Sequence, residues 1–389
     1  MSFFMKNVFS PAILACILIS CTSNKLEDSD RVAHQGPALE LAGSMMLHLD
    51  EYSTYEFFSH QVVNENGREL LCVLNKQNKS FDTYDLESGN LSKRFPIPSE
   101  GPYGISDPYA FLMAGRDSIF VFNQNSFKNT QLLNNEGALQ ASLTPDNMMT
   151  YKYGLNHYSL PNISSQLVGN KIYYGVVGFF DTSDPENFQN DMKLSGVYDL
   201  GTNHLEEMES FTFPKSYTNK GWSTYHAMFS WIKNNENDWV VSFHASDSLF
   251  VYDLDFQLKK SFSAKSQYVK EILPMKRNLD SEEHLRHAVQ SGQYRRLLYD
   301  GYRACYYRIV VHPREFNQNE DKNSIAFNRS PFSIIKLNAD MEVVSETRFQ
   351  GSIYSIFTAF VSERGLCIPR TNYWNNEIEE EKIQIDIFI

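Results

Sequence analysis

Apolar and polar residues alternate along most of this chain after residue 44. The apolar runs are short, have a period of two and are separated by turns rich in Gly, Asn and Asp, which is typical of β-strands joined by tight turns. One marker recurs where a strand ends in a small turn, at residues 84–86, 132–134, 198–200, 252–254 and 336–338, and three of these read "YDL". The abundance of Tyr and Phe, 22 and 28 residues, also favours strands over helices.

The spacing of these markers predicts a repeat architecture. They lie 48, 66, 54 and 84 residues apart, and repeats of about 40–50 residues with four strands each are typical of a β-propeller. Five units are complete, and the sixth lacks a fourth strand. An additional strand at 44–50 precedes the first unit, and we expect it to pair with residues 382–389. The prediction is an all-β, six-bladed propeller whose N-terminal strand closes the ring and removes exposed sheet edges.

A pair of β-sandwiches is the alternative fold, because sandwiches also alternate short strands. That fold explains neither the repeat nor the leftover strands at the two ends of the chain.

The longest spacing, 84 residues, indicates an insertion within one unit. Residues 278–300 predict a helix, since Asp280 can cap its start and Glu283 follows three positions later. Leu285, Ala288 and Val289 give this helix a short apolar stripe.

The first twenty residues have the layout of a signal peptide. Lys6 precedes an apolar run at residues 8–19, which is short for a membrane span. "LISC", residues 18–21, resembles the lipobox of bacterial lipoproteins, in which the Cys carries the acyl chains. We therefore expect a signal peptide at 1–20, lipidation at Cys21, a flexible tether at 21–43 and the propeller at 44–389.

This arrangement predicts a lipid-anchored protein of the bacterial cell envelope, with the outer membrane as the expected location. The "KLED" cluster after Cys21 is similar to acidic surface-export signals of lipoproteins, or is a plain linker. An ordinary secretory signal with an incidental Cys remains the alternative at the N-terminus.

The other cysteines of the expected mature chain are Cys72, Cys305 and Cys367, each within an apolar strand-like run. An odd number with wide spacing does not form a disulfide framework, so we interpret them as small buried residues. One disulfide among them remains open, because the envelope is oxidising.

The formal net charge of −12, with both signs mixed along the chain, argues against a nucleic-acid binder, which needs a basic surface to neutralise phosphates.

The segment "RFPIPSEGPYGISDPYAFLMAGRDSIFVFN", residues 94–123, carries a family resemblance. Gly101, Pro102 and Gly104 match a Gly-Pro-x-Gly connector common between propeller blades. Together with the lipobox and the tether, the chain resembles an uncharacterised lipoprotein family of Bacteroidetes-type bacteria, a domain of unknown function similar to TolB-like six-bladed propellers. The resemblance implies the fold over most of residues 40–389, and it supplies no catalytic residues.

Loop lengths point to one face of the propeller. We name the four strands of each predicted blade A to D in chain order. The A–B and C–D turns are short and lie on one face. The B–C and D–A loops emerge on the opposite face and include long segments at 144–162, 179–192, 213–226, 312–331 and 372–381. Long loops seldom collect on one side unless that side binds something. The candidate ligand-binding residues are therefore aromatic and polar side chains of this face: Tyr103, Tyr153, His157, Trp222, Tyr225, His226, His312, Arg314, Tyr373 and Trp374.

Catalytic motifs are weak in this sequence. His284 and His287 share a helix face, but no third metal ligand follows at a predictable spacing, and we interpret that face as solvated. Asp85, Asp199 and Asp253 recur at the same place in the repeat and are interpreted as turn-capping groups. We expect no metal and no cofactor.

The sequence therefore predicts a non-enzymatic propeller that binds a protein or glycan partner through its long-loop face. The alternative is a hydrolase or lyase acting on a glycan or small ester, with several acidic or His side chains converging at the channel mouth.

Overall fold

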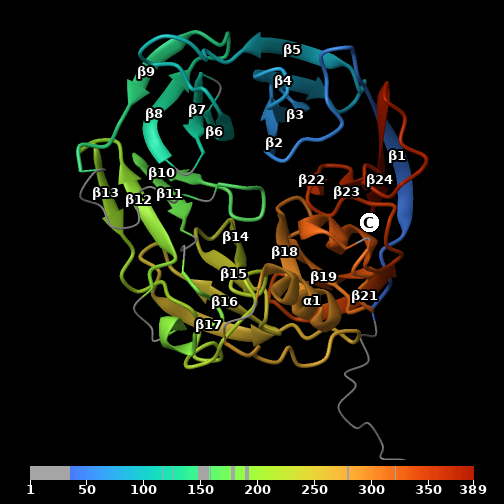
Figure 1. Ribbon diagram of the computed structural model, residues 1–389. Coiled ribbons are helices and arrows are strands. Elements are labelled where there is room, and N and C mark those ends of the chain that lie inside the picture. Colours follow the sequence, from blue (N-terminus) through green and yellow to red (C-terminus); the bar gives the residue numbers. More distant parts are fainter. Residues whose placement is uncertain are drawn as a thin grey trace, which may run out of the picture. The chain divides into compact units, whose positions relative to one another are not determined.

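The computed structural model describes residues 36–389 except 116, 125, 148–156, 158, 177–179, 189–191, 278–279 and 320. The described residues form six four-stranded antiparallel sheets, arranged as blades around a common axis (Figure 1). The predicted six-bladed β-propeller is confirmed.

Each blade runs from an inner strand beside the axis to an outer strand at the rim. Blade one contains β2 (His60–Glu65), β3 (Arg68–Asn75), β4 (Ser80–Asp85) and β5 (Leu91–Pro96), and blade two contains β6 (Pro108–Gly115), β7 (Ser118–Asn123), β8 (Ser126–Leu133) and β9 (Leu139–Leu143). Blade three contains β10 (Gln166–Val168), β11 (Lys171–Gly175), β12 (Ser195–Asp199) and β13 (His204–Glu207).

Blade four contains β14 (Phe229–Lys233), β15 (Trp239–Phe243), β16 (Ser248–Tyr252) and β17 (Leu258–Ser263), and blade five contains β18 (Gln293–Asp300), β19 (Cys305–Val311), β20 (Phe332–Leu337) and β21 (Val343–Phe349). Blade six contains β22 (Phe360–Ser362), β23 (Gly365–Pro369), β24 (Lys382–Phe388) and β1 (Leu41–His48). The helices are α1 (Ser281–Ser291) and the short 3-10 helices η1 (Pro185–Phe188) and η2 (Asn323–Arg329).

Blade six joins the two ends of the propeller. β1 pairs with β24 in antiparallel register, with Leu47 opposite Ile383 and Ser44 opposite Asp386. β1 starts at Leu41 and ends at His48, so it lies slightly earlier in the chain than the predicted 44–50.

A close backbone approach fixes β1 against blade one. The amide of His48 donates to the carbonyl oxygen of Gly89 at 2.8 Å. Gly89 has a φ of +72°, and a Cβ there would lie 1.8 Å from the carbonyl oxygen of Met46. Only glycine satisfies both the backbone angle and the contact.

A buried carboxylate connects the two paired strands. Asp386 on β24 accepts hydrogen bonds from the Ser44 hydroxyl at 2.7 Å and from the Tyr354 hydroxyl at 2.8 Å. Burial by itself would raise the pKa of Asp386, but these bonds and one from Gln384 outweigh it, so the pKa lies below its usual value. The ionised group thus ties β1, β24 and the β21–β22 loop together.

The recurring aspartates of the repeat are turn-capping groups, as predicted. The carboxylate of Asp85 accepts from the amides of the next turn, and Asp199 and Asp253 do the same in blades three and four. This Asx-type bonding explains why the turn after the third strand keeps the same residue.

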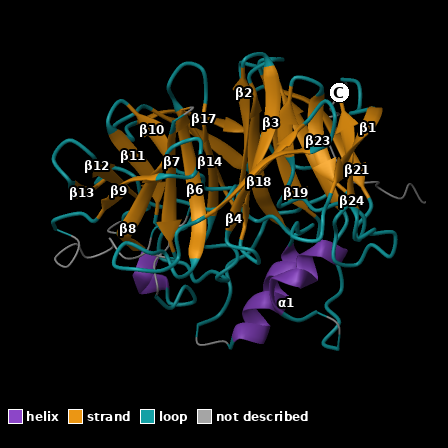
Figure 2. Ribbon diagram, turned by 90° about the horizontal axis from the view of Figure 1, so that it is seen from above, coloured by secondary structure: helices purple, strands orange, loops and turns teal. Residues whose placement is uncertain are grey.

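The loops divide unequally between the two faces of the ring. α1 and the short 3-10 helices lie at one end of the sheets, together with the loops that leave the second and fourth strands (Figure 2). We call this side the long-loop face. At the other end, the described residues between strands form tight turns, as between β2 and β3.

Helix α1 follows the predicted pattern. The side chain of Asp280 accepts from the amide of Glu283 at 2.9 Å, and Leu285, Ala288 and Val289 are buried. His284 differs from the prediction, since it is buried and accepts a hydrogen bond at Nδ1 from the amide of Thr224 at 3.0 Å. That helix face is therefore packed onto a neighbouring loop instead of facing solvent.

The three predicted apolar cysteines, Cys72, Cys305 and Cys367, are buried free thiols.

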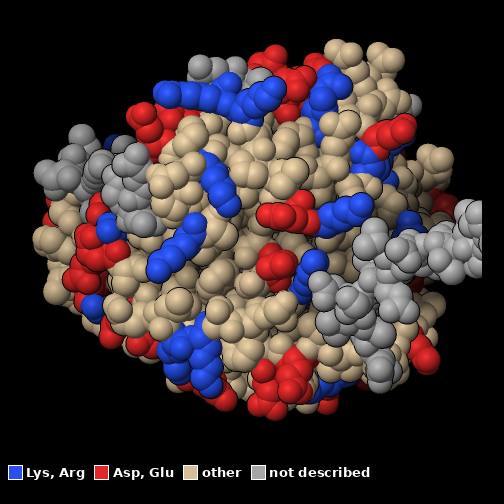
Figure 3. Space-filling view, turned by 90° about the horizontal axis from the view of Figure 1, so that it is seen from below, with Lys and Arg blue, Asp and Glu red and all other residues tan. Residues whose placement is uncertain are grey.

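On the side of the molecule in Figure 3, acidic and basic residues are interspersed. Within the part of the chain that the structure describes, no helix has the length and apolar character needed to cross a bilayer.

Ring closure makes a testable stability prediction. Leu47 of β1 is 1% exposed, so Leu47→Ala should lower the free energy of unfolding by about 2–5 kcal/mol through lost burial and a residual cavity. Leu41 of the same strand is 60% exposed, and Leu41→Ala should change it by less than about 0.5 kcal/mol. Urea unfolding followed by tryptophan fluorescence measures both, and equal effects would contradict the packing of β1.

Candidate functional site

A cavity of about 750 Å³ opens at the centre of the long-loop face. We call it the mouth cavity. Its lining comes from β18 and from eight connections, β1–β2, β9–β10, β11–β12, β13–β14, β15–β16, β19–β20, β21–β22 and β23–β24. Segments from all around the ring therefore meet at one place, which the closed propeller makes possible.

Aromatic side chains dominate this lining. They are Tyr55, Phe57, Phe58, Phe180, Tyr225, Phe357 and Tyr373. Phe58 and Tyr373 are 54% and 61% exposed, which is unusual for large rings and leaves them available to a ligand. Polar groups between the rings include Asn162, Asn328 and several threonines.

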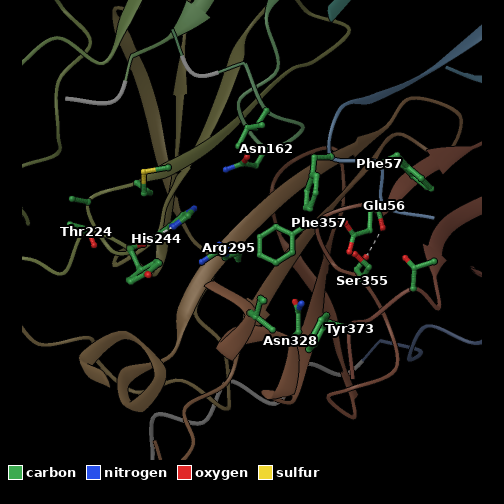
Figure 4. Close-up of a pocket in the computed structure, with 18 of the residues that line it drawn as sticks. Glu56, Phe57, Asn162, Thr224, His244, Arg295, Asn328, Ser355, Phe357 and Tyr373 are labelled. Carbon is green, nitrogen blue, oxygen red and sulfur yellow. Dashed lines mark hydrogen bonds between the residues drawn. The ribbon is translucent and has the colours of Figure 1, made fainter. Parts of the chain in front are cut away.

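Arg295 brings a positive charge into the mouth cavity. Its guanidinium lies 4.6 Å from the ring centroid of Phe357, beside which it is drawn in Figure 4. It also lies 4.7 Å from the ring centroid of Phe327. Two aromatic faces on a planar cation give cation–π attraction and fix the orientation of the group.

A β-bulge places this arginine. In the β18–β19 pair, Tyr294 is opposite Val310 and Arg296 is opposite Ile309, so Arg295 is the extra residue. A bulge breaks the strict alternation of a strand and re-aims a side chain. Consecutive arginines therefore both line the interior of the propeller, Arg295 at the mouth and Arg296 in the channel below.

His244 is the one imidazole among the described residues of the cavity lining. Its Nδ1 donates to the carbonyl oxygen of Tyr225 at 2.9 Å. Burial and the nearby charge of Arg295 lower the pKa of His244 to about 3, so the ring is neutral at ordinary pH. Among the described lining residues, Glu56 is the one carboxylate. The convergence of three or more acidic or His side chains that the sequence analysis set as the sign of a hydrolase or lyase is not found among these residues.

Two of the ten predicted ligand-binding residues, Tyr225 and Tyr373, line the mouth cavity. Tyr153 lies outside the described residues, as does the predicted lipidation site Cys21. Tyr103 is 58% exposed on the β5–β6 loop and does not line the cavity.

Other predicted residues are buried and hydrogen-bonded within the protein. His157 donates through Nε2 to the carbonyl oxygen of Asn123 at 2.8 Å, and His226 donates in the same way to Gly292 at 2.9 Å. Trp222 donates to the carbonyl oxygen of Tyr217 at 3.2 Å. These side chains satisfy loop backbone groups and are not available to a ligand.

The predicted residues of the β19–β20 and β23–β24 loops also hold loops in place. His312 bonds to the Ser333 hydroxyl at 2.9 Å, and Arg314 forms an ion pair with buried Asp321 at 2.6 Å. Arg329 also contacts Asp321, at 3.5 Å, and its guanidinium lies 5.1 Å from the ring centroid of Trp374. Asp321 is therefore the centre of a structural cluster.

Sequence reasoning missed the groups that do converge. Arg295 lies in strand β18, and His244 lies in the short β15–β16 connection. Phe357 lies in the loop between β21 and β22, which joins blades five and six. The one available signal was the pair of arginines in the strand "QYRRLLYD", because adjacent charges are unexpected in an inner strand.

No group of three or more His, Cys, Asp or Glu side chains within the described ranges could hold a metal ion.

Fold and cavity together define a six-bladed β-propeller with an aromatic, arginine-bearing cavity on its loop face. The chain belongs to the DUF4221 family, a domain of unknown function, whose family model matches residues 38–348. A DUF4221 protein from Bacteroides vulgatus is similar in structure, with a TM-score of 0.76 and 24% identity over 90% of this chain and 97% of that one. A Bacteroides fragilis protein presumed to be exported has a TM-score of 0.51 and 10% identity over 90% and 94% of the two chains. No curated protein matches the sequence.

The buried histidines around the site predict acid sensitivity. Burial lowers the pKa of His226 to about 3, so between about pH 6.5 and pH 3 the unfolded chain binds a proton that the folded chain does not. The free energy of unfolding should therefore fall as the pH decreases through this window, by about 1.4 kcal/mol per pH unit for each such histidine.

His226→Gln should reduce that slope by about one proton equivalent, since the amide can still donate to Gly292 but does not titrate. The measurement is urea unfolding between pH 7 and pH 4.5. His204→Gln, at an exposed histidine, should leave the slope close to that of the wild type. Parallel curves for His226→Gln and the wild type would show that the His226 imidazole does not contribute.

Proposed function

We propose that this protein is a lipid-anchored, cell-envelope propeller that binds a protein or glycan partner through the long-loop face, with the mouth cavity receiving a segment of that partner. The observation that carries the proposal is the convergence of exposed aromatic rings and the clamped Arg295 at one cavity of about 750 Å³. Concave, mainly apolar sites with a few placed polar groups are the usual form of ligand sites.

The lining favours a peptide segment over a glycan. Leu160, Met228 and Ile325 add aliphatic surface between the rings, and this surface suits apolar side chains better than hydroxylated sugars. Exposed Tyr and Phe side chains, with one Arg, are also the composition typical of protein-binding hot spots.

The anchor and the location are supported separately. The "LISC" segment at 18–21 follows a signal-type apolar run, and an acylated Cys21 with several chains would give durable membrane attachment. The structurally similar Bacteroides fragilis protein is presumed to be exported, which is consistent with a location outside the cytoplasm.

The binding proposal is tested by capture with the soluble chain from Asn24 onward, immobilised and exposed to envelope extract. Tyr373→Ala should lower recovery of the bound component about tenfold, because it removes an exposed ring from the cavity. The matched control is Tyr302→Ala, which removes a ring of 54% exposure from the β18–β19 turn on the opposite face.

Protease treatment of the captured component then distinguishes a peptide from a glycan. Equal recovery by the wild type and both variants would contradict the assignment of the mouth cavity, and turnover of the component on the resin would contradict a purely binding role.

The anchor is tested by metabolic labelling with a radioactive fatty acid. Cys21→Ser should abolish the label and move the protein from the membrane fraction to the soluble fraction, because it removes the proposed acylation site. Cys16→Ser, within the same signal segment, should keep both the label and the membrane fraction. Retained label in the Cys21 variant would refute lipidation at this position.

A further inference from the structure

A second cavity, of about 280 Å³, lies along the central channel and is lined by the inner strands of several blades. We call it the channel cavity. Leu160 lines both cavities, so the channel cavity adjoins the mouth cavity. It is the more polar of the two, with hydroxyl and amide groups such as Ser159, Ser164 and Gln61 in its wall.

Arg296 lines this cavity and is 3% exposed. Both of its hydrogen bonds start from Nη1 and end at backbone carbonyl oxygens, those of Ile356 at 3.0 Å and of Phe357. Its Nε has no hydrogen-bond partner, and no carboxylate of the described residues pairs with it. A buried cation without a counter-ion is costly, and burial lowers the pKa of Arg296 to about 9.

Another buried arginine shows what a purely structural group looks like in this protein. Arg308 is fully buried on the neighbouring strand β19, and it donates from Nε and both Nη atoms to the Ser242 hydroxyl and to four backbone carbonyl oxygens. Its guanidinium also lies 3.9 Å from the ring centroid of Tyr294. Arg308 is thus satisfied by the protein alone, whereas Arg296 has unused donor capacity beside a cavity.

The charge of the lining has one sign. Lys233, at the end of inner strand β14, lines the channel cavity with Arg296, and no acidic residue is among the lining residues of the described chain. The imidazole of His60 in the same wall is neutral, because burial and the charge of Arg296 lower its pKa to about 3. Arg296 is the buried cation of this wall, whereas the ammonium of Lys233 donates to Asn237 Oδ1 at 2.9 Å in an exposed hydrogen bond. The two like charges give the lining a positive potential, although the net charge of the chain is −12.

We propose that the channel cavity is an anion-binding site, in which Arg296 and Lys233 bind a carboxylate or a comparable small oxyanion. The anion supplies the acceptors that the guanidinium lacks and neutralises the buried charge. The bulge at Arg295 contributes by turning two consecutive arginines toward the interior, one into each cavity. This site stands on different residues from the mouth cavity and does not depend on the proposed partner.

The test titrates the soluble chain with sodium sulfate and, separately, with sodium acetate, at constant ionic strength, by isothermal titration calorimetry. We expect saturable binding of one anion per chain. Arg296→Gln should weaken it at least about tenfold, and Lys233→Gln about threefold, since the first loses a hydrogen-bonded charge and the second a nearby one. Arg68→Gln is the matched control, because the side chain of Arg68 is 68% exposed and lies outside the channel. The anion affinity of this variant should equal that of the wild type.

Crystals of the wild-type chain grown with selenate locate the bound anion directly, and they do so even if Arg296→Gln does not fold. An anomalous peak within hydrogen-bond distance of Arg296 supports the site. No saturable binding, the same affinity for Lys233→Gln as for the wild type, or a selenate peak only on the outer surface would overturn it.

The source of the anion is distinguished by repeating the capture on the mouth cavity in saturating sulfate. Lower recovery identifies the anion as an acidic group of the partner itself, and unchanged recovery identifies it as a free ion. Failure of the capture alone would leave the calorimetric result standing.

Discussion

The antiparallel pairing of β1 with β24 is the contact on which the rest of this molecule depends. It joins residues more than three hundred positions apart, as in the pair Ser44 and Asp386, and it turns a row of sheets into a ring. The cost in chain entropy of closing so long a loop grows only slowly with length, so a well-packed strand can offset it. Apolar burial at Leu47 and the hydrogen-bonded carboxylate of Asp386 supply that packing and its register.

Closure also decides where binding groups can lie. In a ring, every inner strand faces the same axis, and every D–A loop ends on the same side (Figures 1 and 2). Residues that are distant in the chain, such as Phe58, Arg295 and Tyr373, therefore reach one cavity. At the opposite end of each blade the strands are joined by tight turns, because the fold needs no long connections there.

The sequence was informative wherever the signal was local and repeated. Strand alternation, the turn aspartates such as Asp253 and the Asp280 cap all act within a few residues, so pattern alone predicted them. The number of blades could also be predicted, because the unpaired strands at the two ends of the chain must pair with each other if the propeller is to close.

The site residues were harder to predict, because an aromatic or imidazole side chain in a loop can either face a ligand or hydrogen-bond to the protein's own backbone. His157 and His226 look like exposed loop histidines in the sequence, yet each donates to a carbonyl oxygen that a distant segment presents. Nothing local reports that partner. Conversely, Arg295 and Arg296 lie in a strand, where regular alternation would send one of them outward, and only the bulge opposite Ile309 and Val310 brings both inward.

The bulge in β18 is also unusual in what it carries. Blade four has a regular β14–β15 pair, whereas the β6–β7 pair of blade two has two register shifts without any arginine, so a bulge in an inner strand is not by itself a sign of a ligand site. In blade five the irregular strand contains two arginines, one clamped between Phe327 and Phe357 and one buried without a carboxylate. Proteins keep costly local arrangements chiefly where they are used. The departure of β18 from regular geometry therefore matters for binding, because it directs Arg295 and Arg296 into two adjoining cavities, the mouth cavity and the channel cavity.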